Sequence, residues 1–408
     1  MKKLISLYAV IFMGYLGMSI NVILFTTMIF SPSEGLINPS ESLQKKSYLL
    51  GTLISMYPLG QLFGKSLMGR LSDFFGRKKI LIFSLFSSFL FYCIVGYGVQ
   101  IINFPLIILA LLLMGLSEGN IVIAQSVITD QSKDPELRIK RFGMIATMIS
   151  LSRIIGPLLV FHFKFNSKTT ALDFALPFYF IGISFLILLG FSFFLFECQE
   201  SEKSKPGYLP SKLFINLLEH QKFYKIFLAN FLFYLSSSGL FRLYPIYLTT
   251  QFHLDTSQLA KAVALNGLGY IIANYLIMPM LKKFSSIFLL IVFSLISSVL
   301  MFFLTASFGF NITMILMILA SITMGASYTY TIDITAHISE KDKVGEVMGL
   351  NSSFNTLSNI LIGFLGSYVL IISPTGPMLL SAFFALFAFI AFLKIFHNSK
   401  IKNDGAVS

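Results

Sequence analysis

The chain alternates between long apolar stretches and short polar connections along its whole length. Each stretch holds roughly 20 residues, enough for one helix to cross a hydrocarbon core about 30 Å thick. The first stretch is too long for the apolar core of a secretory signal and lacks a small-residue cleavage site, so we expect it to be retained. The pattern predicts an all-α membrane protein with twelve transmembrane helices, near residues 5–30, 47–68, 80–98, 104–128, 142–161, 174–196, 226–249, 258–280, 287–306, 311–335, 347–371 and 376–396.

The composition agrees with this pattern and excludes a soluble globular fold. Of the 408 residues, 56% are hydrophobic and 12% are charged, and the mean hydropathy is +0.81. A soluble domain holds about 25% charged residues. No soluble core of this size could enclose so much apolar surface, so the lipid bilayer is the expected surrounding.

Basic residues are unevenly distributed between the polar connections. With a cytoplasmic amino terminus, most of them fall in loops that face the cytoplasm, and the external loops hold only Lys45, Lys46, Lys164 and Lys168. Cytoplasmic loops of membrane proteins carry such an excess of Lys and Arg. We therefore expect both termini in the cytoplasm and the chain in the inner (cytoplasmic) membrane. The net charge of +12 then serves orientation and contact with anionic lipid headgroups rather than nucleic-acid binding.

The longest polar stretch divides the apolar stretches into two sets of six. We expect an N-terminal half at 1–196, a cytoplasmic linker at 197–225, and a C-terminal half with a short cytoplasmic tail at 226–408. Two related six-helix halves place a solute site near the membrane midplane between them. A shift of 210 residues supports the repeat, because it sets Met114, Gly115 and Ser117 over Met324, Gly325 and Ser327.

One connection carries an acid among basic residues and two glycines: Gly69-Arg-Leu-Ser-Asp-Phe-Phe-Gly-Arg-Lys-Lys79. A loop that serves orientation alone would need neither the acid nor the glycines, which allow a tight reversal. The segment resembles the G-x-L-x-D-R-x-G-R-R/K motif of the major facilitator superfamily (MFS), with Phe74 in place of the usual Arg. The resemblance implies the MFS fold, with its twelve helices in two pseudo-symmetric halves. It also implies a conformational latch, whose contacts break and re-form during transport, made here of Gly69, Asp73, Gly76, Arg77 and Lys78.

The fourth and fifth spans are similar to those of tetracycline and multidrug proton antiporters. Gly115 and Asp130 keep the spacing of that group, but Leu111 stands where the group has an Arg, so the proton-linked role of that Arg does not carry over. The fifth-span pattern G-x8-G-x3-G-P-x2-G-G is half present, since Ser152 replaces its middle glycine and Val160-Phe161 its last pair. The residues that match this pattern are Gly143, Gly156 and Pro157.

Ionisable side chains inside membrane spans are costly and are therefore candidates for function. Glu118 is the only carboxylate well inside an apolar stretch, and burial favours its protonated form, which suits a proton carrier. Alternatively, Glu118 is a structural partner of Arg153 in the neighbouring span, and the two interpretations are compatible. Arg242 could hold an anionic group of a substrate or extend to the outer interface. Further candidates for proton or substrate contact are Asn21, Asn120, Gln125, Asn266 and Tyr328.

Other polar residues lie at span ends or along one helix face. Asp333 closes the tenth span as Asp130 closes the fourth, and these two, with Arg141, are predicted to be cytoplasmic gate residues. Lys65 lies near a span end and is expected to extend its ammonium group to the interface. A polar stripe on the eleventh span either bonds neighbouring helices, which we favour, or lines a cavity. It consists of Asn351, Asn355 and Asn359.

Residues 59–66 resemble the sequence motif of a phosphate-binding loop, but Leu59 replaces its first glycine and no strand precedes it. We therefore expect no nucleotide binding. Gly60 and Gly64 instead predict a close approach of two helices. The histidines lie at span ends or in loops, away from any nucleophile, and the two cysteines make neither a disulfide framework nor a metal site. We therefore expect no enzyme activity, no cofactor and no metal.

These features predict a secondary transporter that moves a small molecule by alternating access, energised by an ion gradient. The leading hypothesis is proton-coupled export of a drug-like compound or secreted metabolite through a Phe- and Met-rich interior. The alternative is proton-coupled uptake of a nutrient, peptide fragment or iron chelate (siderophore), favoured by the missing Arg, the incomplete fifth-span motif and Arg242. A non-transporting membrane sensor is a third hypothesis, against which no soluble signalling domain is found. We expect a monomer whose partners are the lipid bilayer, a small-molecule substrate and H⁺.

Overall fold

The computed structural model describes residues 2–130, 135–163, 170–195, 221–281, 283–306, 308–338 and 344–404, and the regular elements among these residues are all helices. The helices form two compact units. Unit 1 holds Met1–Gly207 together with Leu248–Gly267, and unit 2 holds Tyr208–Tyr247 together with Leu268–Ser408.

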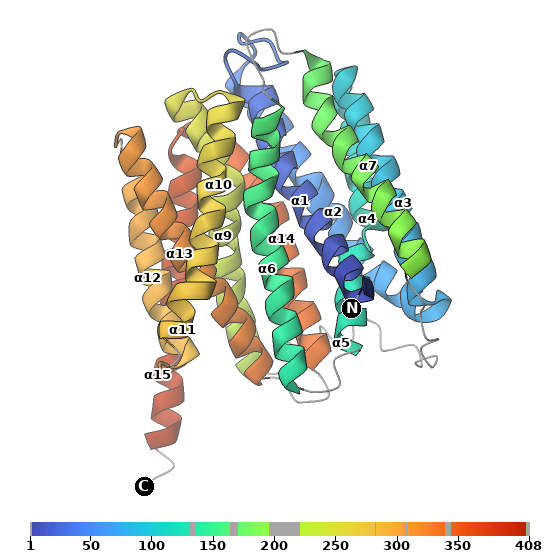
Figure 1. The fold of residues 1–408 in the computed structure, drawn as a ribbon. Coiled ribbons are helices and arrows are strands. Elements are labelled where there is room, and N and C mark those ends of the chain that lie inside the picture. The colour runs from blue at the N-terminus through green and yellow to red at the C-terminus, as the bar shows by residue number, and fades with distance from the viewer. Residues whose placement is uncertain are drawn as a thin grey trace. The chain divides into compact units, whose positions relative to one another are not determined.

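Unit 1 contains the first half of the chain. α3 packs against α4 and α7, α2 packs against α4, and α1 packs against α6 and α7 (Figure 1). The first part of α10 also belongs to this unit. The bounds are α1 Lys2–Phe30, α2 Leu43–Phe75, α3 Arg77–Gln100, α4 Phe104–Ser117, α5 Asn120–Asp130, α6 Pro135–His162, α7 Ala171–Leu195 and α10 Thr256–Ile272.

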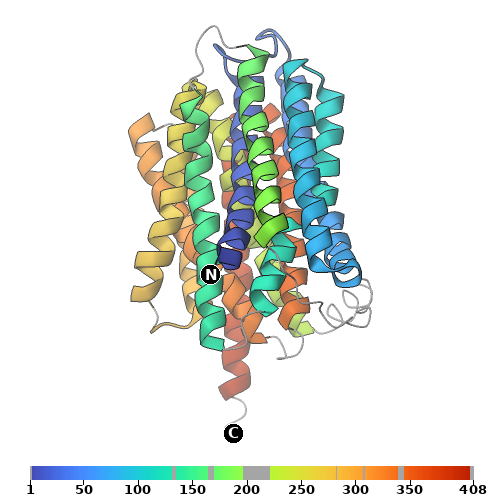
Figure 2. The ribbon, with the colours of Figure 1, turned by 45° about the vertical axis from the view of Figure 1, so that its right-hand side comes forward.

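Unit 2 contains most of α9 and the helices that follow α10 (Figure 2). α12 packs against α13 and α15, while α13 also packs against α14 and the π-helical turn η1. The bounds are α9 Gln221–Phe252, η1 Ala273–Ile277, α11 Met278–Met280, α12 Ser286–Leu304, α13 Phe310–Ile338, α14 Val344–Ile372 and α15 Gly376–Asp404.

The predicted twelve spans are confirmed. Ten helical segments among the described residues are long and apolar enough to cross a membrane, with α4 and α5 counted as one span and α10, η1 and α11 as another. The more polar α2 and the shorter apolar part of α6, Thr147–His162, complete the twelve.

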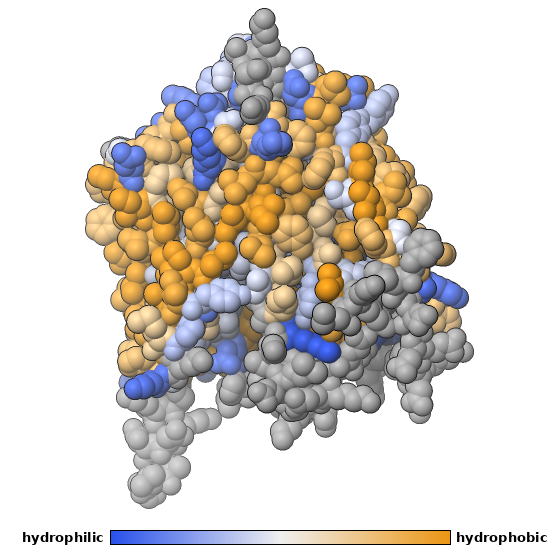
Figure 3. Space-filling view, in the orientation of Figure 1, coloured by the Kyte–Doolittle hydropathy of each residue, from blue (hydrophilic) through white to orange (hydrophobic). Residues whose placement is uncertain are grey.

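The surface has the character expected of lipid-facing helices. Hydrophobic side chains cover the middle of the face shown in Figure 3, and hydrophilic ones gather towards its ends. Large apolar side chains on α3 and α7, such as Phe83 and Phe191, are exposed, as are Phe303 on α12 and Phe387 on α15. An apolar surface of this kind is stable in a bilayer, where the surrounding acyl chains are equally apolar.

The predicted close approach at Gly60 and Gly64 is confirmed, and the partner helix is α4. A Cβ atom at Gly60 would overlap the carbonyl oxygen of Leu112, and one at Gly64 would overlap the carbonyl oxygens of Gly115 and Leu116. A Cβ atom at Gly115 would in turn overlap the carbonyl oxygen of Tyr57 on α2. The two backbones therefore touch directly, as small residues allow in membrane proteins.

The fourth span is interrupted, which the sequence did not indicate. α4 ends at Ser117 and α5 begins at Asn120, which leaves Glu118 and Gly119 between them. The hydroxyl of Ser84 on α3 accepts hydrogen bonds from the backbone N–H groups of Gly119 (2.8 Å) and Asn120 (2.9 Å), and donates one to the carbonyl of Ser117 (2.8 Å). Backbone groups freed inside a membrane must find such partners. One side chain therefore stabilises the break.

A similar close contact occurs in unit 2 between η1, with the end of α10, and α13. These are the second and fourth spans of the C-terminal half, as α2 and α4 are of the N-terminal half. A Cβ atom at Gly325 would lie 3.0 Å from Ala273 Cβ and 3.1 Å from Tyr270 Cα. Gly325 is 210 residues after Gly115, and Tyr270 is 210 after Gly60. In unit 1 the fourth span is interrupted, between α4 and α5. In unit 2 the fourth span, α13, is continuous, and the second span is irregular because α10 is followed by the π-helical turn η1.

The segment at 69–79 differs from the predicted loop. α2 continues to Phe75, so Gly69 lies inside the helix, and a Cβ atom there would meet nothing within 4 Å. Gly76 alone makes the reversal into α3, at φ +95°, a conformation that side-chain-bearing residues rarely adopt. The prediction that both glycines serve the turn is therefore wrong for Gly69.

Replacing Gly64 by Val should destabilise the protein by separating α2 from α4. Overpacking costs about 1–3 kcal/mol, and we expect the upper end because the atoms in the way are backbone carbonyls, which cannot rotate aside. The thermal unfolding midpoint of the purified protein in detergent measures this loss. Gly190→Val on α7, where nothing lies within 4 Å, is the matched control. Equal losses in the two variants would contradict the contact.

Candidate functional site

Glu118 lies at the break between α4 and α5, and its side chain is 3% exposed. Its carboxylate accepts a hydrogen bond from Nε2 of Gln61 on α2. The hydroxyl of Tyr57 is a second hydrogen-bond partner, and the ammonium group of Lys65 is close enough for an electrostatic interaction. The buried acid therefore has three polar neighbours on one helix, α2.

The three partners on α2 occupy one face of that helix. Tyr57, Gln61 and Lys65 follow one another at intervals of four residues, so they lie one turn apart along the same side. Gly60 and Gly64 hold this part of α2 against α4. We call Glu118 and these three residues, together with Tyr92 on α3, the carboxylate cluster.

α1 and α3 complete the surroundings of the carboxylate cluster. A Cβ atom at Gly14 would lie 3.8 Å from Oε1 of Glu118, and one at Gly17 would overlap the hydroxyl of Tyr92. Tyr92 interacts electrostatically with Glu118, and its buried hydroxyl has no hydrogen-bond partner among the described residues. Asn21 shares this face of α1, and its Oδ1 is likewise buried without a partner in the described part of the chain.

The other predicted candidates of unit 1 lie outside the cluster. Arg153 on α6 is half-buried and is not among the partners of Glu118, so the interpretation of Arg153 as the ion-pair partner does not hold. Asn120 is buried and anchors the break, with its Nδ2 donating to Ser88 Oγ at 3.2 Å. Gln125 is half-buried on α5, and Asn266 is buried on α10.

Arg242 on α9 lies in unit 2 and bonds to α14. Its Nε donates to Oδ1 of Asn359 at 2.8 Å, and Nδ2 of Asn359 donates to the carbonyl of Asn355 at 2.9 Å. The second bond fixes the orientation of the amide, because the Asn359 oxygen must then face the guanidinium. The half-buried guanidinium is therefore held against α14.

The polar stripe of α14 bonds to neighbouring helices, which confirms the favoured interpretation. Asn351 accepts from Asn230 Nδ2 (3.1 Å) and donates to the hydroxyl of Tyr234 (2.7 Å), both on α9. Nδ2 of Asn355 donates to the hydroxyl of Tyr328 on α13 at 3.3 Å. Tyr328, a predicted substrate candidate, is thereby joined to the same network as Arg242.

The residues of the predicted latch lie around the turn between α2 and α3. Asp73 is exposed and makes no hydrogen bond or ion pair with the residues that the structure describes. Arg77 begins α3, and the ammonium group of Lys78 lies 5.6 Å from the centre of the Phe193 ring on α7.

The predicted gate residues belong to several helices. Arg141 on α6 is half-buried and interacts electrostatically with Tyr8 on α1. Asp333 on α13 accepts a hydrogen bond from the hydroxyl of Ser286, the first residue of α12. The side chain of Asp130 lies outside the described residues.

Gly156, one of the antiporter-like residues of α6, serves helix packing. A Cβ atom at Gly156 would lie 2.9 Å from Ser19 on α1, so this glycine lets the two helices approach. Pro157 has no N–H to donate to the carbonyl of Arg153. A Cβ atom at Gly267 of α10 would lie 3.1 Å from that carbonyl oxygen. Gly143 is within α6, but its surroundings lie outside what the structure describes.

Glu34, in the connection between α1 and α2, is a buried carboxylate that the sequence analysis missed. It accepts a hydrogen bond from the backbone N–H of Thr256 at 2.8 Å and another from the Thr256 hydroxyl. Thr256 is the first residue of α10, and Glu34 is 5% exposed. A carboxylate stabilises the N-terminus of a helix, where backbone N–H groups lack partners. Only a contact distant in sequence could reveal this role.

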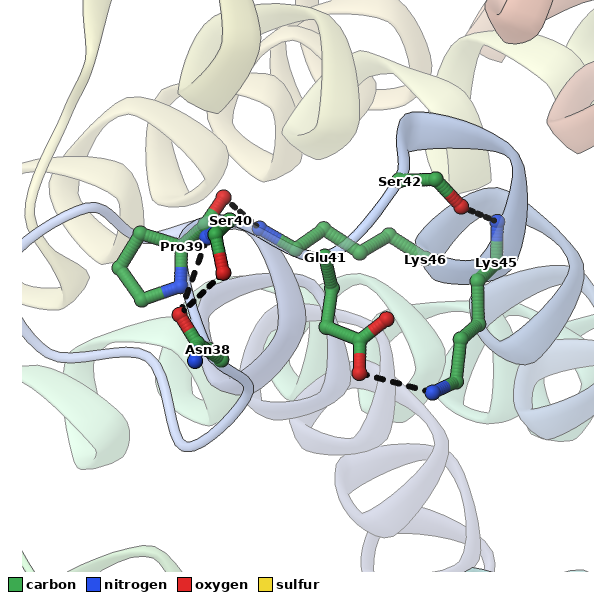
Figure 4. Close-up of polar contacts among 7 residues, drawn as sticks. All are labelled: Asn38, Pro39, Ser40, Glu41, Ser42, Lys45 and Lys46. Atoms are coloured by element: carbon green, nitrogen blue, oxygen red, sulfur yellow. Dashed lines mark hydrogen bonds and ion pairs between the residues drawn. The ribbon is translucent and has the colours of Figure 1, made fainter.

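The same connection offers a half-exposed acid for comparison (Figure 4). Oε1 of Glu41 pairs with the ammonium group of Lys45 at 2.8 Å, and the Lys45 backbone N–H donates to Ser42 Oγ, which caps α2. Lys46 reaches the carbonyl of Pro39 at 3.1 Å. These contacts are solvated, so they contribute little to stability.

Ten long apolar helices among the described residues, with buried polar clusters inside each unit, are the features of a membrane transporter. Comparison with known sequences identifies its class. The profile of the Major Facilitator Superfamily matches residues 7–222 and 226–406. The chain belongs to the Major Facilitator Superfamily, whose members carry small molecules across membranes and are not enzymes.

Several curated proteins are similar in sequence. Tetracycline resistance protein, class H, of Pasteurella multocida is 28% identical over 193 residues, covering 45% of this chain and 46% of the relative. Tetracycline resistance protein, class B, of Escherichia coli is 27% identical over 149 residues, covering 35% and 36%. These matches thus span less than half of each resistance protein. Multidrug resistance protein 2 of Bacillus subtilis (strain 168) is 23% identical over 343 residues, covering 82% and 83%.

Solved structures confirm the fold. A mutant of the nucleoside transporter NupG has a TM-score of 0.76 at 13% identity, covering 97% of this chain and 100% of that one. A D-xylose-proton symporter has a TM-score of 0.76 at 13% identity, covering 96% and 97%. At such identity the likeness concerns the fold alone.

Replacing Glu34 by Ala should lower the free energy of unfolding by about 1.5–3 kcal/mol, the usual contribution of hydrogen bonds to a charged group. Glu41→Ala should cost less than about 1 kcal/mol, because its ion pair is exposed. Thermal unfolding of both purified variants in detergent checks the difference. If Glu34→Ala is as stable as Glu41→Ala, the contact between Glu34 and the start of α10 contributes nothing to the stability of the protein.

Proposed function

We propose that this transporter exports an amphiphilic compound, either drug-like or a secreted metabolite, in exchange for protons. The observation that carries the proposal is the Glu118 carboxyl, which is buried inside a membrane span and bonded to side chains of α2. A buried acid that can gain and lose a proton as the protein changes conformation is suited to couple the proton gradient to transport.

The direction of transport rests on the relatives. Two of them are named for tetracycline resistance and one for multidrug resistance, which favours efflux. The half-present fifth-span motif points the same way, since Gly156 and Pro157 match it. The distribution of Lys and Arg supports an inner-membrane location with both termini in the cytoplasm, and we propose that the chain acts as a monomer.

The second candidate is proton-coupled uptake of an anionic nutrient or iron chelate. The bond between Arg242 and Asn359 favours it, because an oriented guanidinium can bind a carboxylate or phosphate group through two parallel hydrogen bonds. In that case the substrate would carry an acidic group, whereas an exporter of amphiphilic compounds would accept uncharged and basic ones as well.

Transport in membrane vesicles of known orientation separates these candidates. For an exporter, inside-out vesicles with an acidic interior should accumulate tetracycline or an amphiphilic fluorescent dye. Accumulation in right-side-out vesicles driven by an inward proton gradient would overturn export and favour uptake. If neither a panel of amphiphilic dyes nor a panel of anionic compounds shows gradient-driven flux, the hypothesis of a non-transporting membrane sensor would be favoured.

Replacing Glu118 by Gln should abolish gradient-driven flux and spare substrate binding. Gln keeps the shape and can still bond to Gln61 and Tyr57, but it cannot release a proton. Flux in vesicles and equilibrium binding to the purified protein measure the two effects. Glu41→Gln, at a half-exposed carboxylate in the connection before α2, is the control and should retain both. Undiminished proton-coupled flux in the Glu118 variant would remove this residue from proton transfer.

Replacing Asp73 by Asn should slow transport about tenfold, equivalent to ~1.4 kcal/mol in the barrier, while leaving affinity nearly unchanged. The reason is that the proposed latch forms and breaks between conformations and does not touch the substrate. Initial rates and equilibrium binding in proteoliposomes check the two parts. Arg70→Gln, which changes an exposed charge on the same end of α2, is the control. A large loss of affinity without a loss of rate would count against the latch.

A further inference from the structure

Among the described residues, the helices packed against the break at Glu118 bring few charged groups to it. α1 approaches with Gly14, which has no side chain, and α3 approaches with the phenol of Tyr92. α2 brings Tyr57, the neutral amide of Gln61 and the ammonium group of Lys65. Among the partners that the structure gives for Glu118, Lys65 is therefore the cation.

The position of Lys65 follows from the contact between α2 and α4. Gly64 touches the backbone of Gly115 and Leu116, immediately before Glu118. Gln61 bonds to the carboxylate, and Lys65 is one helical turn further along the same face of α2. The flexible four-carbon side chain of a lysine lets its ammonium group approach or leave such a carboxylate without movement of the helix.

A carboxyl group in a membrane interior has two stable conditions. It can bind a proton and be neutral, or it can be ionised beside a cation that compensates its charge. An ionised group with neither is too costly to persist. The proton and a nearby ammonium group are therefore competitors for the same carboxylate.

We propose that Lys65 is a positioning residue that competes with the transported proton for Glu118. When the Glu118 proton leaves for the aqueous side to which the site is open, Lys65 moves onto the carboxylate, and when a proton returns, Lys65 is released. The proposal rests on the proposed function, since it assigns a partner to the same acid. It corrects the expectation that Lys65 only extends to the interface, and it replaces Arg153 as the partner.

The test measures the protonation of Glu118 directly. The purified protein in lipid is titrated with pH while its infrared difference spectrum is recorded, and the carboxyl band lost in Glu118→Gln identifies the residue. In Lys65→Met the midpoint of that band should move to higher pH by about one to three units, the effect of removing a nearby opposite charge. Lys65→Arg, which keeps the charge, should retain a midpoint close to that of the unaltered protein.

Lys261→Met is the matched control. Lys261 lies in another span, with its ammonium group 4.4 Å from the centre of the Phe161 ring on α6, so its removal should leave the midpoint unchanged. A midpoint in Lys65→Met equal to that of the unaltered protein would overturn the proposal. So would a shift in Lys65→Arg as large as that in Lys65→Met.

A stability measurement covers the case in which Lys65→Met folds poorly. Because the cost would come from an ionised Glu118 without its cation, the double variant Lys65→Met/Glu118→Gln should recover the lost stability, as a double-mutant cycle shows. Additive losses would overturn the proposal. The proposed function has its own test. Unchanged proton-coupled flux in Glu118→Gln would overturn it, and this result does not depend on the infrared titration.

Discussion

The direct backbone contact between α2 and α4 determines where the Glu118 carboxyl lies and what surrounds it. Gly60, Gly64 and Gly115 leave no side chain between the two helices, so the polar face of α2 comes within hydrogen-bonding distance of the break in the fourth span. With larger residues at these positions, the helices would separate and Glu118 would lose Gln61. A buried acid without hydrogen-bond partners is strongly disfavoured. The proton transfer proposed for Glu118 therefore depends on three glycines that have no side chain and take no part in it.

The repeat places different chemistry at equivalent points of the two halves of the sequence. Tyr328 is 210 residues after Glu118, so a neutral phenol in one half corresponds to an acid in the other. Thr329, the counterpart of Gly119, donates a hydrogen bond to Asn274 Oδ1 in the π-helical turn at 2.8 Å. π-helical turns are frequent at functional sites. Each half thus departs from regular helix where its second and fourth spans meet, and among the described residues the carboxyl group at such a point is Glu118 in unit 1.

The sequence predicted the parts of the structure that depend on local composition. The length of each apolar stretch fixes the twelve spans, and the glycines at 60 and 64 indicate close packing, because both features can be read without knowing the partner. The break at Glu118 was not predictable, since the hydroxyl that stabilises it comes from Ser84 on another helix. Lys65 and Gln61 were missed as partners of Glu118 for a similar reason. The position of Arg153 in the neighbouring span suggested an ion pair, but which faces of two helices meet is not encoded by their separation in sequence.

The hydroxyl of Ser84 has a consequence for how this protein can vary. It accepts two hydrogen bonds and donates one, so its whole bonding capacity is used on the backbone of the break. Only threonine offers the same group on a side chain of similar size. Among related sequences, serine or threonine at this position should therefore accompany an interrupted fourth span even where Glu118 has been replaced. The residue at position 84 would then indicate whether the fourth span is interrupted, whereas the residue at position 118 would indicate whether a carboxyl group is present at the break.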